Sequence, residues 1–122
     1  MELTEEFILE GKSFIYIDFS GIKKKDDLAK SFDIIKSIIA KYPENSLYKI
    51  TNVAGVRFDS EIKEMLVDYV SHNKPYVKSG VIIGVDGIKK ITINSIYKIT
   101  ERTNMLFAFS KEQAIDLLLK HE

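Results

Sequence analysis

The chain has 122 residues, of which 45% are hydrophobic and 30% charged, and its 18 basic and 18 acidic side chains cancel. This length and composition are typical of one globular domain and exclude a disordered chain. The balanced charge argues against a nucleic acid partner, and the absence of cysteine excludes disulfides and cysteine-type zinc sites. No run approaches the roughly 20 apolar residues of a membrane span. The acidic start of the chain is unlike a secretory signal, so we expect a cytoplasmic protein.

Two extended runs open the chain, at residues 7–10 and 13–20, and Gly11-Lys12 joins them. This pattern predicts a β-hairpin. Both faces of the second run are largely apolar, so we expect this strand to be covered on both sides, as in layered α/β domains. The outer edge of the hairpin must be paired, covered or charged, and a homodimer through this edge is one open alternative.

The charged residues 23–27 predict a solvated loop, which leads into an amphipathic helix. Over residues 28–42 the apolar side chains recur at steps of three and four, the period of one helix face. Pro43 is expected to end this helix because proline lacks a backbone donor. Residues 46–53 then predict a second core strand.

Asp59 and Ser60 indicate the start of the next helix, because a short side-chain oxygen can accept a bond from a backbone N–H there. An apolar stripe over residues 62–70 supports this helix, which is expected to end before Pro75. Residues 75–90 predict the buried central strand of the sheet. This strand should deliver a small polar turn, Asp86-Gly87, to one edge.

Residues 88–100 fit two structures. Asp86-Gly87 is typical of a hairpin turn, and the apolar residues after it alternate as in a strand. As a helix, the same segment places Ile88, Ile91, Ile96 and Ile99 roughly on one side. Residues 105–109 predict another strand, and parallel pairing needs a crossover of about a dozen residues before it, which favours the helix.

Ser110 and Gln113 match a capping box, which predicts a last helix. The complete order is a hairpin followed by alternating helices and strands. This order predicts an α/β fold with a mixed, mostly parallel sheet of four to five strands, an N-terminal hairpin and about four helices. We expect one domain over residues 1–122.

Polar residues follow the predicted strands at their carboxyl ends, where ligands bind in open α/β sheets. They are Asp18, Ser20 and Gly21, then Asn52, Gly55 and Arg57, then Asp86, Gly87, Lys89 and Lys90. Backbone donors near Gly87, together with the two lysines, are a candidate group for binding a phosphate or carboxylate. Arg57 is a candidate for recognising an anion or a carboxylate of a partner.

No residues predict catalysis or a metal centre. The two histidines, His72 and His121, lack the spacing of a zinc site. Asp18, Asp59 and Asp86 can in principle pair as acid and base, but aspartate is expected at the ends of strands and helices in any case. We therefore expect no enzyme, no cofactor and no metal.

Several segments in this order resemble the SpoIIAA-like family. They are residues 14–21, the run Thr51-Asn52-Val53-Ala54-Gly55-Val56-Arg57-Phe58, residues 72–78, residues 84–90 and Phe107 with the helix after it. The resemblance implies the STAS-like fold of anti-sigma factor antagonists, related more distantly to CRAL-TRIO lipid-binding domains. It also favours the helix over residues 88–100.

STAS antagonists carry an Asp-Ser-Ser-Gly-like turn at a helix start, and a partner kinase phosphorylates the second serine. Asp59 and Ser60 match this turn, but Glu61 stands where the second serine would be, and the glycine is missing. The resemblance therefore implies a permanent negative charge at Glu61, which the helix dipole favours. Ser60 is interpreted as a helix cap, with its phosphorylation as the less favoured alternative.

The sequence thus predicts a non-enzymatic regulatory or protein-interaction domain of the STAS type, with an anti-sigma-like or other regulator as partner. The predicted binding residues lie in the loops 52–61 and 85–90: Asn52, Arg57, Asp59, Ser60, Glu61, Asp86, Gly87, Lys89 and Lys90. The alternative is a carrier that binds an apolar or phosphorylated small molecule between the helices and the sheet. Tyr69, Tyr76 and Tyr97 are expected to pack in the core or its rim, or to line such a pocket.

Overall fold

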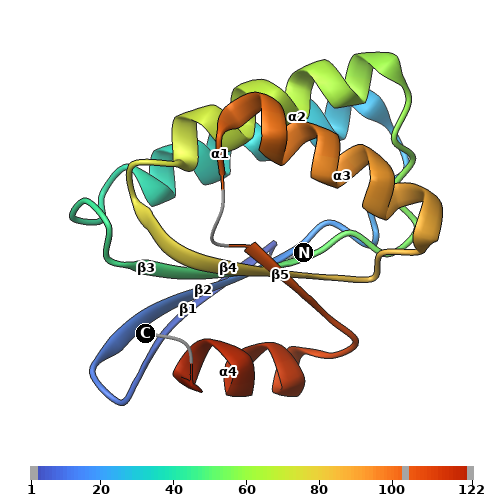
Figure 1. The fold of residues 1–122 in the computed structure, drawn as a ribbon. Helices are drawn as coiled ribbons and strands as arrows, with labels where there is room; N and C mark the ends of the chain where they lie inside the picture. Colours follow the sequence, from blue (N-terminus) through green and yellow to red (C-terminus); the bar gives the residue numbers. More distant parts are fainter. Residues whose placement is uncertain (1–2, 103–104, 121–122) are drawn as a thin grey trace.

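The computed structural model describes residues 3–102 and 105–120, and it has an α/β fold built on one mixed sheet (Figure 1). The strands are β1 (Thr4–Leu9), β2 (Lys12–Asp18), β3 (Leu47–Asn52), β4 (Val77–Ile83) and β5 (Met105–Ala108). The helices are α1 (Lys25–Ile39), α2 (Ser60–Asn73), α3 (Gly87–Thr100) and α4 (Lys111–Lys120). The predicted fold class, with its N-terminal hairpin and four helices, is confirmed.

The predicted hairpin is formed by β1 and β2, which pair antiparallel from Thr4↔Ile17 to Leu9↔Lys12. Its two-residue turn is Glu10-Gly11, one residue earlier than predicted, and both residues have positive φ, 50° and 76°. Such turns match the twist of the flanking strands. On its outer side β1 pairs with no strand of the described part, so it forms one edge of the sheet.

The strands lie in the sheet in their chain order, β1-β2-β3-β4-β5, and all pairs after the hairpin are parallel. Strand–helix–strand connections between parallel strands have the same hand. When each connection leads to the next strand in the same direction across the sheet, their helices all lie on one face. Accordingly α1, α2 and α3 cover one face, and α4 lies against the other (Figure 1). The predicted buried strand in residues 75–90 is β4, which is paired on both sides and buried from Gly80 to Ile83, but the middle strand of the sheet is β3.

Alternate residues of each inner strand point to different faces and form two cores. In β2, Ile15 and Ile17 pack with the three-helix layer, whereas Phe14 packs on the α4 side with Ala114 and Leu118. The expectation that this strand is covered on both faces is confirmed.

Helix α1 begins at Lys25, three residues before the predicted start, so only the first part of residues 23–27 is a loop. Asp26 and Asp27 lie in its first turn, where the helix dipole favours a negative charge. The regular helix ends at Ile39, and shorter turn bonds, Lys41 N–H to the Ile38 carbonyl at 3.2 Å among them, lead to Pro43.

Asp59, not Ser60, caps α2. Its backbone is extended, with φ −82° and ψ 179°, and its Oδ1 accepts the Ile62 N–H at 2.9 Å. Ser60 is already the first helical residue, so the interpretation of Ser60 as the cap is wrong. Helix α3 starts in the same way, since Asp86 Oδ1 accepts the Lys89 N–H at 2.9 Å. Asp86-Gly87 therefore opens a helix and no hairpin, and the helical alternative for residues 88–100 is confirmed.

The predicted capping box of α4 is present. Ser110 Oγ accepts the Gln113 N–H at 3.1 Å, and Gln113 Oε1 accepts a backbone N–H at 2.7 Å in return. The second donor is Phe109, one residue before the cap. Side chains thus satisfy two donors at this helix start.

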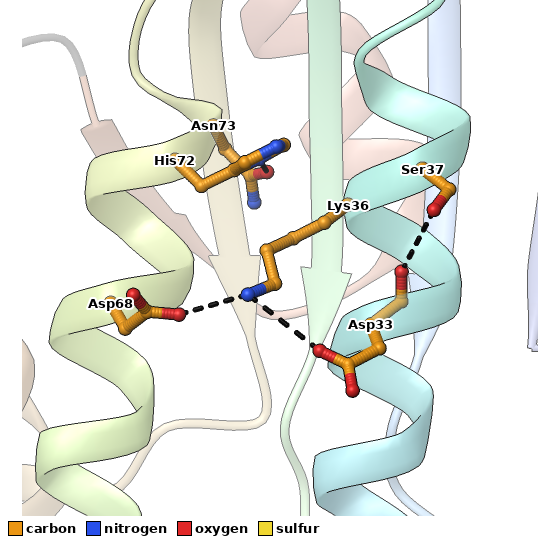
Figure 2. A network of polar contacts seen from close by, with 6 residues as sticks. All are labelled: Asp33, Lys36, Ser37, Asp68, His72 and Asn73. Carbon is orange, nitrogen blue, oxygen red and sulfur yellow. Dashed lines mark hydrogen bonds and ion pairs between the residues drawn. The ribbon is translucent and has the colours of Figure 1, made fainter.

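Figure 2 shows Lys36 of α1 reaching towards α2, where its Nζ lies 2.9 Å from Asp68 Oδ2. Asp33 Oδ1 lies 3.7 Å from the same Nζ. The hydrogen bond with Asp68 raises the pKa of Lys36. Both carboxylates are exposed to solvent, so this link adds little to stability. His72 and Asn73 at the end of α2 share a polar contact of 3.0 Å.

Candidate functional site

A groove of about 210 Å³ opens at the carboxyl ends of β2 and β3, between the loop after β2 and the loop before α2. We call it the cationic groove. It is lined by Ile22, Lys23, Lys24, Lys25, Leu28, Val56, Arg57, Asp59 and Ile62. Gly55, with φ 76°, turns the chain after β3, and a side chain there would meet Lys23 Nζ at 3.4 Å.

Lys25 is neutralised by its neighbours. Its Nζ lies 2.9 Å from Glu61 Oε2 and 3.4 Å from Asp59 Oδ2. The hydrogen bond with Glu61 raises the pKa of Lys25. The backbone N–H of Ile62, with help from Lys25, lowers the pKa of Asp59. This cluster ties the start of α2 to the start of α1.

Lys23, Lys24 and Arg57 are exposed, and none of them forms an ion pair with another residue in the described ranges. The groove thus presents three uncompensated cations. The sequence indicated Arg57, but it placed the lysines only in a solvated charged loop. The lysines join the site because the loop that carries them lies beside residues 55–59.

Asn52 does not join this group. Its side chain lies on the α4 side of the sheet, where Nδ2 is 3.4 Å from the Tyr16 hydroxyl, and its Oδ1 accepts the Ala54 N–H at 3.0 Å. Asp18 is likewise engaged in its own turn, where Oδ1 accepts the Ser20 N–H at 2.9 Å. Asp18, Asp59 and Asp86 therefore each serve a turn or a helix cap.

The predicted anion site at Gly87 has two lysines that diverge. Lys89 Nζ lies 5.8 Å from the centre of the Phe58 ring, and Lys90 Nζ lies 5.0 Å from the centre of the Phe107 ring. Lys89 thereby links the start of α3 to the loop that carries Arg57. The two loops named by the sequence are neighbours on one surface, but their charged groups do not converge on one point.

Beyond Gly87, α3 carries an apolar stripe on its exposed side. Ile88, Ile91 and Ile99 are 81%, 73% and 59% exposed. Their spacing in the helix puts them on one face. The prediction that Ile96 shares this face is wrong, because Ile96 is buried with Ile93 and Tyr97. Large apolar side chains gathered on a surface are typical of a site of protein contact.

A second site lies between β3 and the helices α2 and α3. It is an apolar cavity of about 40 Å³ with Lys49 and Thr51 of β3 in its wall. Its other lining residues are Phe19, Val53, Phe58, Leu66, Tyr69, Val70, Ile82, Ile93, Ile96 and Tyr97. We call it the Lys49 cavity. Lys49 was not predicted as a functional residue, although a lysine in a strand with apolar residues on both faces indicates a buried amine.

Metal and membrane features are absent from the described part of the chain. No group of three histidine, aspartate or glutamate side chains there can hold a metal ion. No helix in residues 3–102 and 105–120 combines the length and apolar character needed to cross a bilayer. His121 lies outside the described residues.

Comparisons with protein-family models and with curated proteins find no match to this chain. The SpoIIAA-like resemblance therefore stays a prediction, carried by the order of elements and the segments quoted above.

Proposed function

We propose that this chain is a non-enzymatic regulatory domain that binds an acidic segment of a protein partner in the cationic groove. The observation that carries the proposal is the set of three uncompensated cations, Lys23, Lys24 and Arg57, around one groove. The groove lies beyond the carboxyl ends of parallel strands, the usual ligand position in open α/β sheets. The STAS resemblance points to the same loops.

Two features favour a protein over a nucleic acid. The apolar stripe of Ile88, Ile91 and Ile99 supplies the kind of contact that protein interfaces bury at their centre. The chain also has no net charge to attract a phosphate backbone. An acidic protein segment can place its carboxylates against Arg57 and keep the rest of its contact apolar.

The test compares two charge-reversal pairs. K23E/R57E changes the groove, whereas K41E/K98E changes exposed lysines at the other end of the sheet and makes the same change in net charge. Proteins captured from the native host by the wild type are quantified against both variants. The partner is then purified, and its Kd is measured at several salt concentrations.

We expect the wild type and K41E/K98E to retain the same partner and K23E/R57E to lose it. The purified partner should bind more weakly as salt rises, since screening weakens contacts between exposed charges. If both charge-reversal variants capture the same amount of partner, the cationic groove is not the binding site. A catalytic turnover that disappears on changing Asp59 or Asp86 would overturn the non-enzymatic assignment.

The second candidate function is that of a small-molecule carrier. The observation that favours it is the Lys49 cavity, which lies where such a ligand was expected, between helices and sheet. A ligand bound in that cavity would not depend on the cationic groove.

A further inference from the structure

Lys49 is a buried amine in the middle strand of the sheet. The residue is 3% exposed, and its neighbours on the adjoining strands are Ile15 and Gly80, neither of which carries a polar side chain. Its Nζ lies 5.0 Å from the centre of the Tyr69 ring. Among the residues that the structure describes, it has neither a hydrogen bond nor an ion pair, which is rare because a buried lysine is normally paired.

Two hydroxyl groups in the same wall are also unused. The Thr51 Oγ1 and Tyr69 OH atoms are buried and have no hydrogen-bond partner of normal geometry within the described ranges, although the Asn73 side chain approaches the Tyr69 hydroxyl. Thr51 stands two residues after Lys49 on the same face of β3, and Tyr69 comes from α2 opposite. Buried polar atoms without partners are exceptional in folded proteins, and these two line the same cavity as Lys49.

The electrostatics of this region favour a negative ligand. No carboxylate lines the described wall of the Lys49 cavity. Burial, together with the smaller effect of the nearby Arg102 charge, lowers the pKa of Lys49 to about 7. Arg102 is itself buried and donates from Nη2 to the Met105 sulfur at 2.9 Å. Met105 pairs with Gly80 on β4, where a side chain would meet the Met105 sulfur at 2.7 Å.

We propose that the Lys49 cavity binds a short-chain monocarboxylate, with the carboxylate on Lys49, Thr51 and Tyr69 and the alkyl end among the apolar side chains. The amine and the two hydroxyls are three donors that together match the two oxygens of one carboxylate. Phe58 and Leu66 are half-buried and form the outer part of the wall, so the alkyl end points towards them.

The size of the cavity sets the length of the ligand. One water molecule needs roughly 10–15 Å³ of cavity volume. The cavity of about 40 Å³ therefore has room for three to four atoms of the size of a water oxygen. Acetate fits this space, and propionate fits with a small outward movement of Phe58. A phosphate ester or a long-chain lipid exceeds it.

Binding must take up a proton at alkaline pH, because the ion pair needs the charged amine. The ionisable groups around Lys49 are Tyr69 of α2, Tyr97 of α3 and Arg102 after α3. Burial raises the pKa of both tyrosines, so they stay neutral below pH 10, and Arg102 stays cationic. Lys49 is then the group that titrates, and the affinity for acetate should fall about tenfold per pH unit above 7 and level off below it.

The test is a titration of the complete chain with acetate, followed by NMR of the methyl groups of Ile93 and Ile96 and by calorimetry. Acetamide, which has the same shape and no charge, serves as the matched ligand. At pH 8.5, calorimetry in buffers of different ionisation enthalpy counts the protons taken up. Saturable binding of acetate with a Kd of about millimolar is expected, since a ligand of four non-hydrogen atoms supplies little binding free energy.

The variants are Lys49→Met, which keeps the shape of the side chain, and Thr51→Val, which removes one hydroxyl. Lys49→Met should abolish acetate binding, and Thr51→Val should weaken it about fivefold while the dependence on pH remains. Lys98→Met, on the exposed side of α3, is the control and should bind as the wild type does.

The proposal is overturned if acetamide binds as tightly as acetate, if Lys49→Met retains the affinity of the wild type, or if the affinity is independent of pH between 6 and 9. It is also overturned if no saturable shift is seen. None of these results bears on the cationic groove, so failure here is distinguishable from failure of the proposed partner site.

Discussion

At the scale of single residues, two serines at helix starts have different roles. Ser110 precedes α4 and its Oγ accepts the Gln113 N–H, whereas Ser60 is the first residue inside α2 and Asp59 holds the capping position. The side chain that caps a helix must sit on the extended residue just before it. The same residue type therefore contributes stability at one position and almost none at the other.

We expect Ser110→Ala to lower the free energy of unfolding by about 1 kcal/mol, the usual loss on removing a cap. Ser60→Ala should change it by less than about 0.5 kcal/mol, as for other exposed positions away from such features. Urea denaturation followed by circular dichroism measures both. A larger loss at Ser60 than at Ser110 would contradict the assignment of the caps.

The role of a residue was predictable where it depends on a local sequence pattern. Four consecutive residues predict the cap at Ser110, and the pair Asp59-Ser60 predicts the correct helix start. Lys49 was missed because its burial depends on α2 and α3 packing over β3, contacts that no local pattern contains. The separation of Asn52 from Arg57 was missed for a related reason, since one residue of shift in a strand changes the face on which a side chain lies.

At the scale of elements, α4 is the one helix of the described residues that covers the second face of the sheet, and Leu118 and Ala114 are its fully buried residues. Leu118→Ala should lower the free energy of unfolding by roughly 2–5 kcal/mol, because it leaves a cavity as well as losing buried area. Leu117→Ala makes the same chemical change on a partly exposed side chain and should lower it by at most about 1 kcal/mol. Denaturant titrations of both variants test this, and equal losses would mean that α4 packs differently.

The elements themselves were largely readable from the chain. Segment 88–100 could not be assigned from its own periodicity, since isoleucines at steps of two and three fit both structures. The decision came from the need for a crossover between parallel strands, a constraint of topology. The position of a strand within the sheet was not predictable, because no pattern in residues 75–90 shows that β4 is followed by β5 at the edge of the sheet.

At the scale of the whole molecule, the buried amine makes stability depend on pH. The pKa of Lys49 is about 7 in the folded chain against an ordinary value of 10.5. Between these values the unfolded chain binds a proton that the folded chain does not, so stability rises with pH across this window. The total change is roughly 3–5 kcal/mol, and the folded state is penalised in full below pH 7.

Melting temperatures of the wild type and Lys49→Met between pH 6.5 and 9.5 check this prediction. The wild type should gain stability over this range, and Lys49→Met should be more stable near pH 7 and nearly independent of pH. The range stops at 9.5 because burial raises the pKa of Tyr69 and Tyr97, whose ionisation on unfolding lowers stability at higher pH. Parallel curves for the two proteins would show that Lys49 is not the group responsible.

The agreement between strand order and chain order has a consequence for biosynthesis. A ribosome releases the hairpin before the three strands that follow it, and each later strand finds the edge of its predecessor already formed, so the sheet can grow as the chain emerges. The three-helix layer is complete before α4 leaves the exit tunnel. Until then Phe14, Tyr48 and Ile50 on the opposite face have no cover, and the nascent chain at this last stage is the form most exposed to aggregation and to capture by chaperones.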